Sequence, residues 1–322
     1  MFKRKSLIAL AAVAVMTIAA CGSFAANPSA EINWPANVTI VVSAGPGGDT
    51  DFNARLLAAE LSKYLPPNFV VSNVVGSGGV TGLRQVATGP MDGSTAAMFH
   101  SAFVVNQLTG IADFGFEAYE FGAIVAAHPG MVLLVRPELG VNTLEELFEY
   151  TKANPGKLLY GVETGAVSFA VGVLLTQNGL DVTLVDAGPT AERITMLLGG
   201  HVDIIASAFG LVADYIKEGM FIPLGIDGVA DLHAPGFDVI ECFVTQGFDI
   251  KVPFYYFMAF PAGTDPNLVA AVNEVIERTV RTNTEYREAI TTFYQSPFFA
   301  PGAEGLAIFE EVYQILSQVD FN

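Results

Sequence analysis

The hydrophobic positions of this chain form two alternating patterns. Short runs of Val and Ile, such as residues 37–44 (NVTIVVSA), are typical of strands buried inside a sheet. Between them lie segments with a single apolar stripe, such as residues 51–65, where Leu57, Leu61 and Leu65 share one helical face. This alternation predicts β-α-β units, and therefore an α/β fold built on parallel sheets with right-handed crossovers.

The alternation occurs as two separate series. The first predicts strands at 37–44, 68–75 and 95–100, and the second predicts strands at 157–162, 181–187 and 201–208. A long apolar strand at 252–264 follows, and then two amphipathic helices at 265–282 and 305–319. These last helices have no third sheet to join, so we expect them to return to the first series. The predicted lobes are residues 31–128 with 253–322, and residues 129–252.

The N-terminus has the pattern of a secretory signal peptide, predicted over residues 1–20. Three basic residues precede the apolar run 6–20, and Cys21 follows it. The sequence IAAC favours a lipoprotein, with Cys21 lipidated and residues 21–30 as a tether, because Cys242 is the only other cysteine. Ordinary cleavage after Ala25 is the alternative. Either way we expect an extracytoplasmic protein that contacts the membrane only through a lipid anchor.

Charge excludes one class of partner. The whole chain carries a net charge of −18, and the part after residue 20 has 12 basic and 33 acidic residues, a net charge of −21. A protein this acidic repels phosphate backbones, so we expect no nucleic-acid partner.

The sequence contains no recognisable catalytic or cofactor motif. The loop GPGGDT lacks the Lys-Ser/Thr ending of a P-loop, no nucleophile elbow is present, and the four histidines lack zinc-ligand spacing. His100 and Ser101 are neighbours on a predicted strand, so their side chains point to opposite faces. We therefore expect no catalytic residue, no metal and no cofactor.

Loops rich in Gly and small polar residues follow the predicted strands. They are GPGGDT (45–50), GSGG (76–79), HSA (100–102), ETGAVS (163–168), DAGPT (186–190) and SAFG (207–210). Parallel sheets bind ligands at the carboxyl ends of their strands, and helix N-termini there favour anions. Two lobes that both present such loops predict a ligand cleft between them.

Several segments resemble the solute receptors of tripartite tricarboxylate transporters. The similarity lies in PGGDTDFNARLLAAEL, NVVGSGGVTGLRQVA, GPTAERITMLLGGHVD and FPAGTDPNLVAAVNEVI, in the same order along the chain. The resemblance implies a type II periplasmic-binding-protein fold, with two lobes joined by a hinge. It also implies capture of a small carboxylate-bearing metabolite by clamshell closure, for delivery to integral membrane permease subunits.

The resemblance also implies the ligand-binding residues. Carried over to this sequence, they are Gly47, Gly48, Asp49, Thr50, Gly78, Gly79, Ser101, Thr164, Gly165, Ser168, Asp186, Ala187, Gly188 and Ser207.

Three acidic residues depart from the common pattern of that family. Asp49, Glu163 and Asp186 stand near the predicted cleft, and carboxylates repel an anionic ligand. Either these side chains point away, or the ligand also carries a cation, as an amino-acid-like molecule does.

Three functions remain open on the sequence. The first is a transport receptor for a small carboxylate or amino-acid-like ligand. The second is a sensing receptor of the same fold that reports to a signalling partner. The third is an enzyme on a two-lobed scaffold, which the missing catalytic motif disfavours.

Overall fold

The computed structural model describes residues 32–321. The predicted signal peptide, the tether to residue 30 and the lipidation site Cys21 lie outside the described residues.

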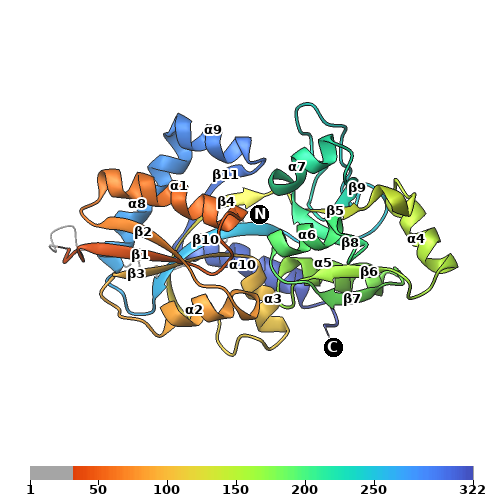
Figure 1. The fold of residues 1–322 in the computed structure, drawn as a ribbon. Helices are drawn as coiled ribbons and strands as arrows, with labels where there is room; N and C mark the ends of the chain where they lie inside the picture. Colours follow the sequence, from red (N-terminus) through yellow and green to blue (C-terminus); the bar gives the residue numbers. More distant parts are fainter. Residues whose placement is uncertain (1–31, 322) are drawn as a thin grey trace, which may run out of the picture.

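Two sheets form the centres of two lobes (Figure 1). The first sheet has six strands in the order β11-β4-β10-β3-β1-β2. Its strands are β1 (Asn37–Val42), β2 (Asn68–Asn73), β3 (Thr95–His100), β4 (Tyr119–His128), β10 (Phe254–Pro261) and β11 (Ser296–Pro301). The second sheet has five strands in the order β7-β6-β8-β5-β9. Its strands are β5 (Met131–Val135), β6 (Leu159–Val162), β7 (Thr183–Asp186), β8 (Ile204–Ala208) and β9 (Ile222–Ile226).

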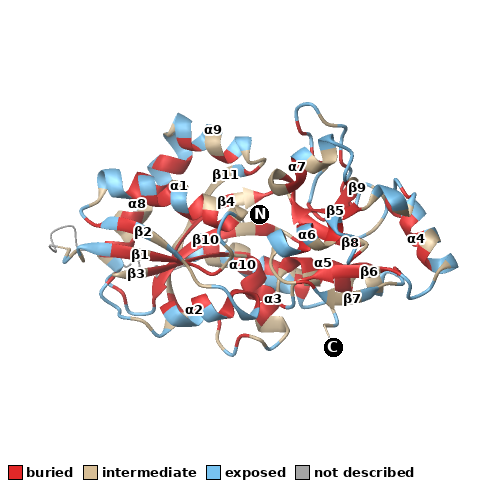
Figure 2. Cartoon of the chain, viewed as in Figure 1, coloured by how far each residue is buried: buried red, intermediate tan, exposed pale blue. Residues whose placement is uncertain are grey.

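Helices cover both faces of the sheets. The helices around the first sheet are α1 (Asp49–Tyr64), α2 (Val80–Ala87), α3 (Ala102–Leu108), α8 (Pro266–Thr282), α9 (Thr284–Thr292) and α10 (Gly302–Leu316). Those around the second are α4 (Leu144–Ala153), α5 (Val167–Gln177), α6 (Thr190–Leu198) and α7 (Phe209–Lys217). Figure 1 shows α1 and α8 on one side of the first sheet and α2 on the other. The buried residues form two clusters, a larger one that extends from the first lobe into the second and a smaller one under α6 and α7 (Figure 2).

Both sheets contain the predicted parallel strands, and antiparallel strands join them. β1 pairs with β2 and β3 in parallel, whereas β10 pairs with β3 and β4 antiparallel. In the second sheet β6 pairs with β7 and β8 in parallel, whereas β5 pairs with β8 and β9 antiparallel. Two of the antiparallel strands, β5 and β10, follow the crossings between lobes, and β11, which follows α9, pairs antiparallel with β4 at the edge of the first sheet.

Some elements escaped the sequence prediction. β4 is buried along nearly its whole length, so it has no alternation of polar and apolar positions that would mark it as a strand. α9 buries only Tyr286 and Ile290, which leaves it without a clear apolar stripe. β11 pairs only with β4 at the edge of the first sheet and contains two prolines.

The crossings between the lobes lie close together around Asp227. The segment Pro129–Gly130 joins β4 to β5, and the chain returns through Val252 into β10. The Met131 N–H donates to Asp227 Oδ1, and the Val252 N–H donates to the Asp227 carbonyl at 2.8 Å. Asp227 therefore ties both connecting segments together.

Candidate functional site

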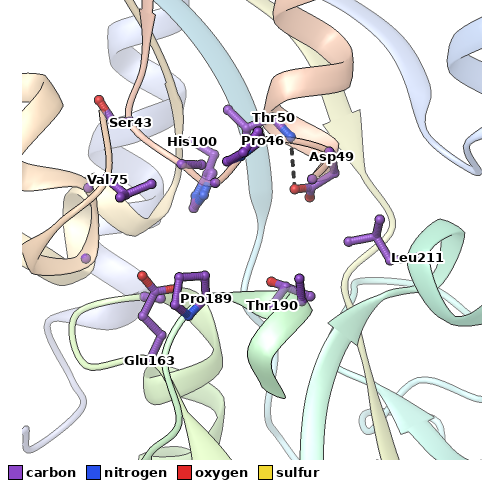
Figure 3. A pocket seen from close by; sticks show the side chains of 18 of the residues that line it. Ser43, Pro46, Asp49, Thr50, Val75, His100, Glu163, Pro189, Thr190 and Leu211 are labelled. Atoms are coloured by element: carbon purple, nitrogen blue, oxygen red, sulfur yellow. Dashed lines mark hydrogen bonds between the residues drawn. The ribbon is translucent and has the colours of Figure 1, made fainter. Parts of the chain in front are cut away.

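A cavity of about 350 Å³ lies between the two lobes. Its wall comes from both sides: residues 43–50, 75–79 and 99–100 of the first lobe, and Glu163, Ala166, residues 189–195, Leu211 and Tyr215 of the second. Figure 3 shows side chains of the two lobes facing each other across this space. The volume suits a small metabolite.

The N-terminus of α1 opens onto the cavity. Gly47 has a φ of +76°, which favours glycine, and Gly48 at the N-cap has no side chain to cap the helix. Asp51 fixes the loop because its Oδ2 accepts hydrogen bonds from the Gly47 N–H and from Arg55 Nε, both at 2.9 Å. The positive end of a helix dipole therefore faces the ligand space, as an anionic group requires.

Two hydroxyl groups beside this helix end are buried without a hydrogen-bond partner among the described residues. They are Ser43 Oγ, in a residue that is 2% exposed, and Thr50 Oγ1, in a residue that is fully buried. Both residues line the cavity, but Ser43 Oγ lies on the side of Gly82 in α2, where a Cβ added to Gly82 would meet it at 2.6 Å. A buried hydroxyl without a partner is costly, which makes the Thr50 hydroxyl a candidate to bind a ligand.

His100 offers a neutral donor in the same wall. Its Nδ1 accepts a hydrogen bond from the Ala102 N–H at 3.2 Å, which places the ring proton on Nε2. Burial lowers the pKa of His100 to about 4, so the imidazole is uncharged at neutral pH. Its ring lies between Phe99 and Phe254, with centroids at 4.1 and 4.7 Å.

Asp49 lines the cavity, but its carboxylate is bound within the first lobe. Oδ2 accepts a hydrogen bond from the Tyr256 hydroxyl, and Oδ1 accepts one from the Thr50 N–H. Asn53 supports the same arrangement by donating to the Asp49 carbonyl and to Gln295 Oε1. Both carboxylate oxygens of Asp49 therefore have partners in the protein.

The second lobe places Glu163 opposite, backed by a buried arginine. The guanidinium of Arg193, 1% exposed, donates to the Gly188 carbonyl at 2.8 Å and to Thr190 Oγ1 at 2.9 Å. Its contact with Glu163 Oε2 is longer, at 3.5 Å. Burial raises the pKa of Glu163, and the charge of Arg193 opposes that rise.

Eight of the sequence-predicted residues lie outside the cavity wall, and several of them hold the loops in shape. Asp186 accepts hydrogen bonds from the Thr164 hydroxyl at 2.6 Å and from the Gly188 N–H at 3.0 Å. Burial alone would raise the pKa of Asp186, but these hydrogen bonds lower it overall. Ser168 Oγ accepts from the Glu163 N–H.

The remaining members of this group are also engaged with the protein. Ser101 Oγ accepts a hydrogen bond from the Tyr255 N–H at 3.0 Å, and the Ser207 hydroxyl donates to the Ala208 carbonyl. The Ala187 N–H donates to the Val162 carbonyl. These contacts orient strand ends and loops rather than facing the cavity.

Gly78 and Gly165 mark a seam where the lobes touch. A Cβ on Gly78 would lie 2.8 Å from the Thr164 carbonyl oxygen, and one on Gly165 would lie 2.5 Å from Asn106 Oδ1. The Asn106 amide donates to the Gly78 carbonyl at 2.9 Å. Glycine at both positions therefore lets two backbones from different lobes approach closely at the rim.

The structure thus gathers six predicted residues at the cavity: Gly47, Gly48, Asp49, Thr50, Gly78 and Gly79. The cleft loops predicted from the sequence include His100 and Thr190, although neither was named as a ligand contact. Ser43 and Tyr215 in the wall and Arg193 behind it were not predicted. Ser43 ends the β1 run and was counted as part of the strand. Of these residues, only Arg193 could have been suspected from the sequence, because it is the only basic residue in α6.

Residues 32–321 contain no group of three or more His, Cys, Asp or Glu side chains arranged to hold a metal ion. In the same range no helix is both long and apolar enough to cross a bilayer.

Comparisons with known proteins agree on one family. Residues 53–309 match the family described as the tripartite tricarboxylate transporter family receptor. Protein BugT of Bordetella pertussis is 27% identical over 281 residues, covering 84% of this chain and 84% of its own.

Solved structures show the same fold. MatC from Rhodopseudomonas palustris with bound malate has a TM-score of 0.76 and 23% identity, over 88% of this chain and 97% of that one. R. palustris Rpa4515 with adipate has a TM-score of 0.78 and 22% identity, over 89% of this chain and 96% of that one.

Proposed function

The chain belongs to the tripartite tricarboxylate transporter receptor family of the Bug type, and from this premise we propose that it captures a small carboxylate-bearing metabolite between its lobes. The family is one of periplasmic solute-binding receptors. The proposal extends to delivery of the ligand to the permease subunits of a tripartite tricarboxylate-type transporter. Similar proteins of known structure carry malate and adipate, which are small carboxylates.

One observation carries the binding proposal for this chain. Thr50, whose hydroxyl is buried without a partner among the described residues, lies at the N-terminus of α1 and lines a cavity shared by both lobes. A carboxylate accepts hydrogen bonds from hydroxyls and backbone N–H groups, and the helix dipole favours its charge. The first lobe supplies these donors, and the second lobe closes over the ligand.

The experiment has two steps. Mass spectrometry of small molecules retained after gentle purification identifies the ligand, and calorimetric titration then measures its affinity for the wild type and for Gly48→Val. Gly48 has a φ of −79°, and a Cβ there would meet only the Gly45 carbonyl oxygen, at 3.4 Å, so the variant should fold. We expect its added side chain to reduce binding at least tenfold. Unchanged binding by a folded Gly48→Val protein would refute the proposed site.

We also propose that Cys21 carries a lipid that anchors the receptor to the membrane. The support is the basic and apolar N-terminal sequence before IAAC. Two acyl chains anchor stably, whereas one does not. Intact-mass measurement of the native protein should find a diacylglyceryl group on Cys21; an unlipidated N-terminus at Ala26 would contradict this.

A further inference from the structure

The charged side chains that line the cavity are all acidic. Among the described residues in the wall, Asp49 and Glu163 carry carboxylates, and no Lys or Arg lines the space. The nearest cation named above, Arg193, is buried behind the wall. A plain dicarboxylate would add two more negative charges to a site that already holds more acidic than basic groups.

The two acidic residues are not equivalent. Both oxygens of Asp49 have partners within the first lobe, Tyr256 and the Thr50 N–H. Glu163 has one side-chain partner, the 3.5 Å contact with Arg193, and its side chain remains 29% exposed. Figure 3 shows its carboxylate directed from the second lobe toward the space below His100 and Val75. Glu163 is therefore the carboxylate that can receive a ligand.

Arg193 lies beside Glu163 but leaves its carboxylate free to accept hydrogen bonds from a ligand. Its shorter hydrogen bonds go to the Gly188 carbonyl and to Thr190 Oγ1, at 2.8 and 2.9 Å. The guanidinium thus stays fixed in the loop whether or not Glu163 binds something else. Its charge favours the ionised form of Glu163 against the effect of burial.

The opposite wall supplies a separate indication of a ligand. Thr50, fully buried, lines the same cavity and carries a hydroxyl without a partner among the described residues. A ligand that satisfies both walls carries a carboxylate on the side of the first lobe and a hydrogen-bond donor with positive charge on the side of the second. An α-amino acid or a similar amine-bearing acid has this arrangement, since its ammonium group has three donors and no acceptor.

We propose that Glu163 is a specificity-determining residue that binds the ammonium group of an amine-bearing carboxylic acid and disfavours plain di- and tricarboxylates. The inference rests on the proposed function of the cavity and names its ligand class. The hydrogen bond between ammonium and carboxylate is charge-assisted, and it forms in a site that closure shields from water.

Matched pairs of acids test the inference directly. Calorimetric titration at neutral pH compares aspartate with succinate and glutamate with glutarate, in the wild type, Glu163→Gln and Glu192→Gln. Glu192 lies on the same lobe, is exposed and does not line the cavity, so its variant controls for the loss of one negative charge. We expect the wild type and Glu192→Gln to bind the amine-bearing member of at least one pair at least tenfold more tightly, and Glu163→Gln to lose that preference.

The outcomes separate the two proposals. Equal or tighter binding of succinate and glutarate by the wild type overturns the ammonium site and leaves the carboxylate receptor standing. A preference for the amine-bearing acid that persists in Glu163→Gln shows that another group binds the ammonium, and it overturns the role proposed for Glu163. The comparison within the wild type requires no variant to fold. Absence of binding by all four acids would count against the proposed receptor function in this size range and against the inference with it.

Discussion

Individual side chains determine what the cavity can hold. Thr50 offers a hydroxyl, His100 offers a neutral N–H group, and Glu163 offers a carboxylate from the other lobe. Asp49, which the sequence placed among the ligand residues, uses both of its oxygens within the first lobe. Donors of the first lobe therefore lie opposite the carboxylate of Glu163, and the second lobe also lines the cavity with the hydroxyl-bearing residues Thr190, Thr195 and Tyr215.

The Thr50→Val variant distinguishes the contribution of the Thr50 hydroxyl to ligand affinity from its contribution to the free energy of unfolding. The replacement removes a buried hydroxyl that has no partner in the described part of the chain and keeps the shape of the side chain. We expect the affinity for the ligand to fall at least about tenfold, since a hydrogen bond to a charged group is worth about 1.5–3 kcal/mol, while the free energy of unfolding stays the same or rises. Titration calorimetry and thermal unfolding measure the two quantities.

Thr279→Val is the matched control. Thr279 has an equally buried hydroxyl without a partner among the described residues, but it lies in α8 away from the cavity wall. This variant should change stability in the same direction and leave ligand affinity unchanged. Equal affinities for Thr50→Val and Thr279→Val would show that the Thr50 hydroxyl does not bind the ligand.

Asp227 makes stability depend on pH. Burial raises the pKa of Asp227 to about 8 in the folded protein, against an ordinary value of 3.8. Between these two pH values the unfolded chain has lost this proton and the folded chain has kept it, so the free energy of unfolding falls as pH rises. Each unit of pKa difference corresponds to about 1.4 kcal/mol.

Asp227→Asn should remove this contribution and keep the acceptor for the Met131 N–H. We expect the variant to gain at least roughly 1 kcal/mol over the wild type at pH 7 and less at pH 5. Urea unfolding at both pH values provides the measurement. A difference between variant and wild type that does not change with pH would show that Asp227 is ionised in the folded state.

The helices and strands show how much the sequence could predict. β1, α1, β3 and the Gly-rich loops were predictable because their apolar runs and turn residues lie together in the sequence. β4 and β11 were not, because their pairing with β10 and with each other depends on segments more than a hundred residues apart. For the same reason the sequence could not predict the hydrogen bond from the Tyr256 hydroxyl to Asp49 or the one from the Tyr255 N–H to Ser101.

The turn between α9 and β11 reaches across to the second lobe. Tyr294 has a φ of +58°, unusual for a residue with a side chain, and its ring lies 4.6 Å from the ring of Phe209 at the start of α7. Backbone strain of this kind persists only when surrounding contacts fix it. The aromatic contact therefore stabilises the arrangement in which the lobes touch.

Tyr294→Ala should weaken ligand binding by destabilising that arrangement. Aromatic pairs are worth about 0.5–1.5 kcal/mol beyond buried area, so we expect a loss of about threefold to tenfold in affinity. Tyr294→Phe keeps both the ring and the backbone conformation and should bind like the wild type. If the alanine variant binds as tightly as the phenylalanine variant, the contact does not contribute to closure.

At the scale of the whole molecule, the mechanism that we propose is hinge closure around the cavity. The lobes are joined near Pro129–Gly130, Asp227 and Val252, and they touch at Gly78–Thr164 and at Tyr294–Phe209. A ligand favours the closed state only if it binds that state more tightly than the open one. The lobe boundaries given by the sequence, residues 31–128 with 253–322 and residues 129–252, remain a prediction that such motion would test.

Small-angle scattering measures this closure. We expect the radius of gyration to fall when the tightest-binding acid of the panel saturates the wild type. Gly165→Ala should resist compaction, because its Cβ would lie 2.5 Å from Asn106 Oδ1 and 2.7 Å from Ile111 Cδ1 across the seam. A saturated wild type with an unchanged radius of gyration would exclude the hinge mechanism.

A crystal structure with the tightest-binding acid tests the central claim most directly. The account predicts the ligand between the lobes, with a carboxylate oxygen within hydrogen-bond distance of Thr50 Oγ1 at the N-terminus of α1. A ligand bound elsewhere, or bound in this cavity with no carboxylate near that hydroxyl, would contradict it.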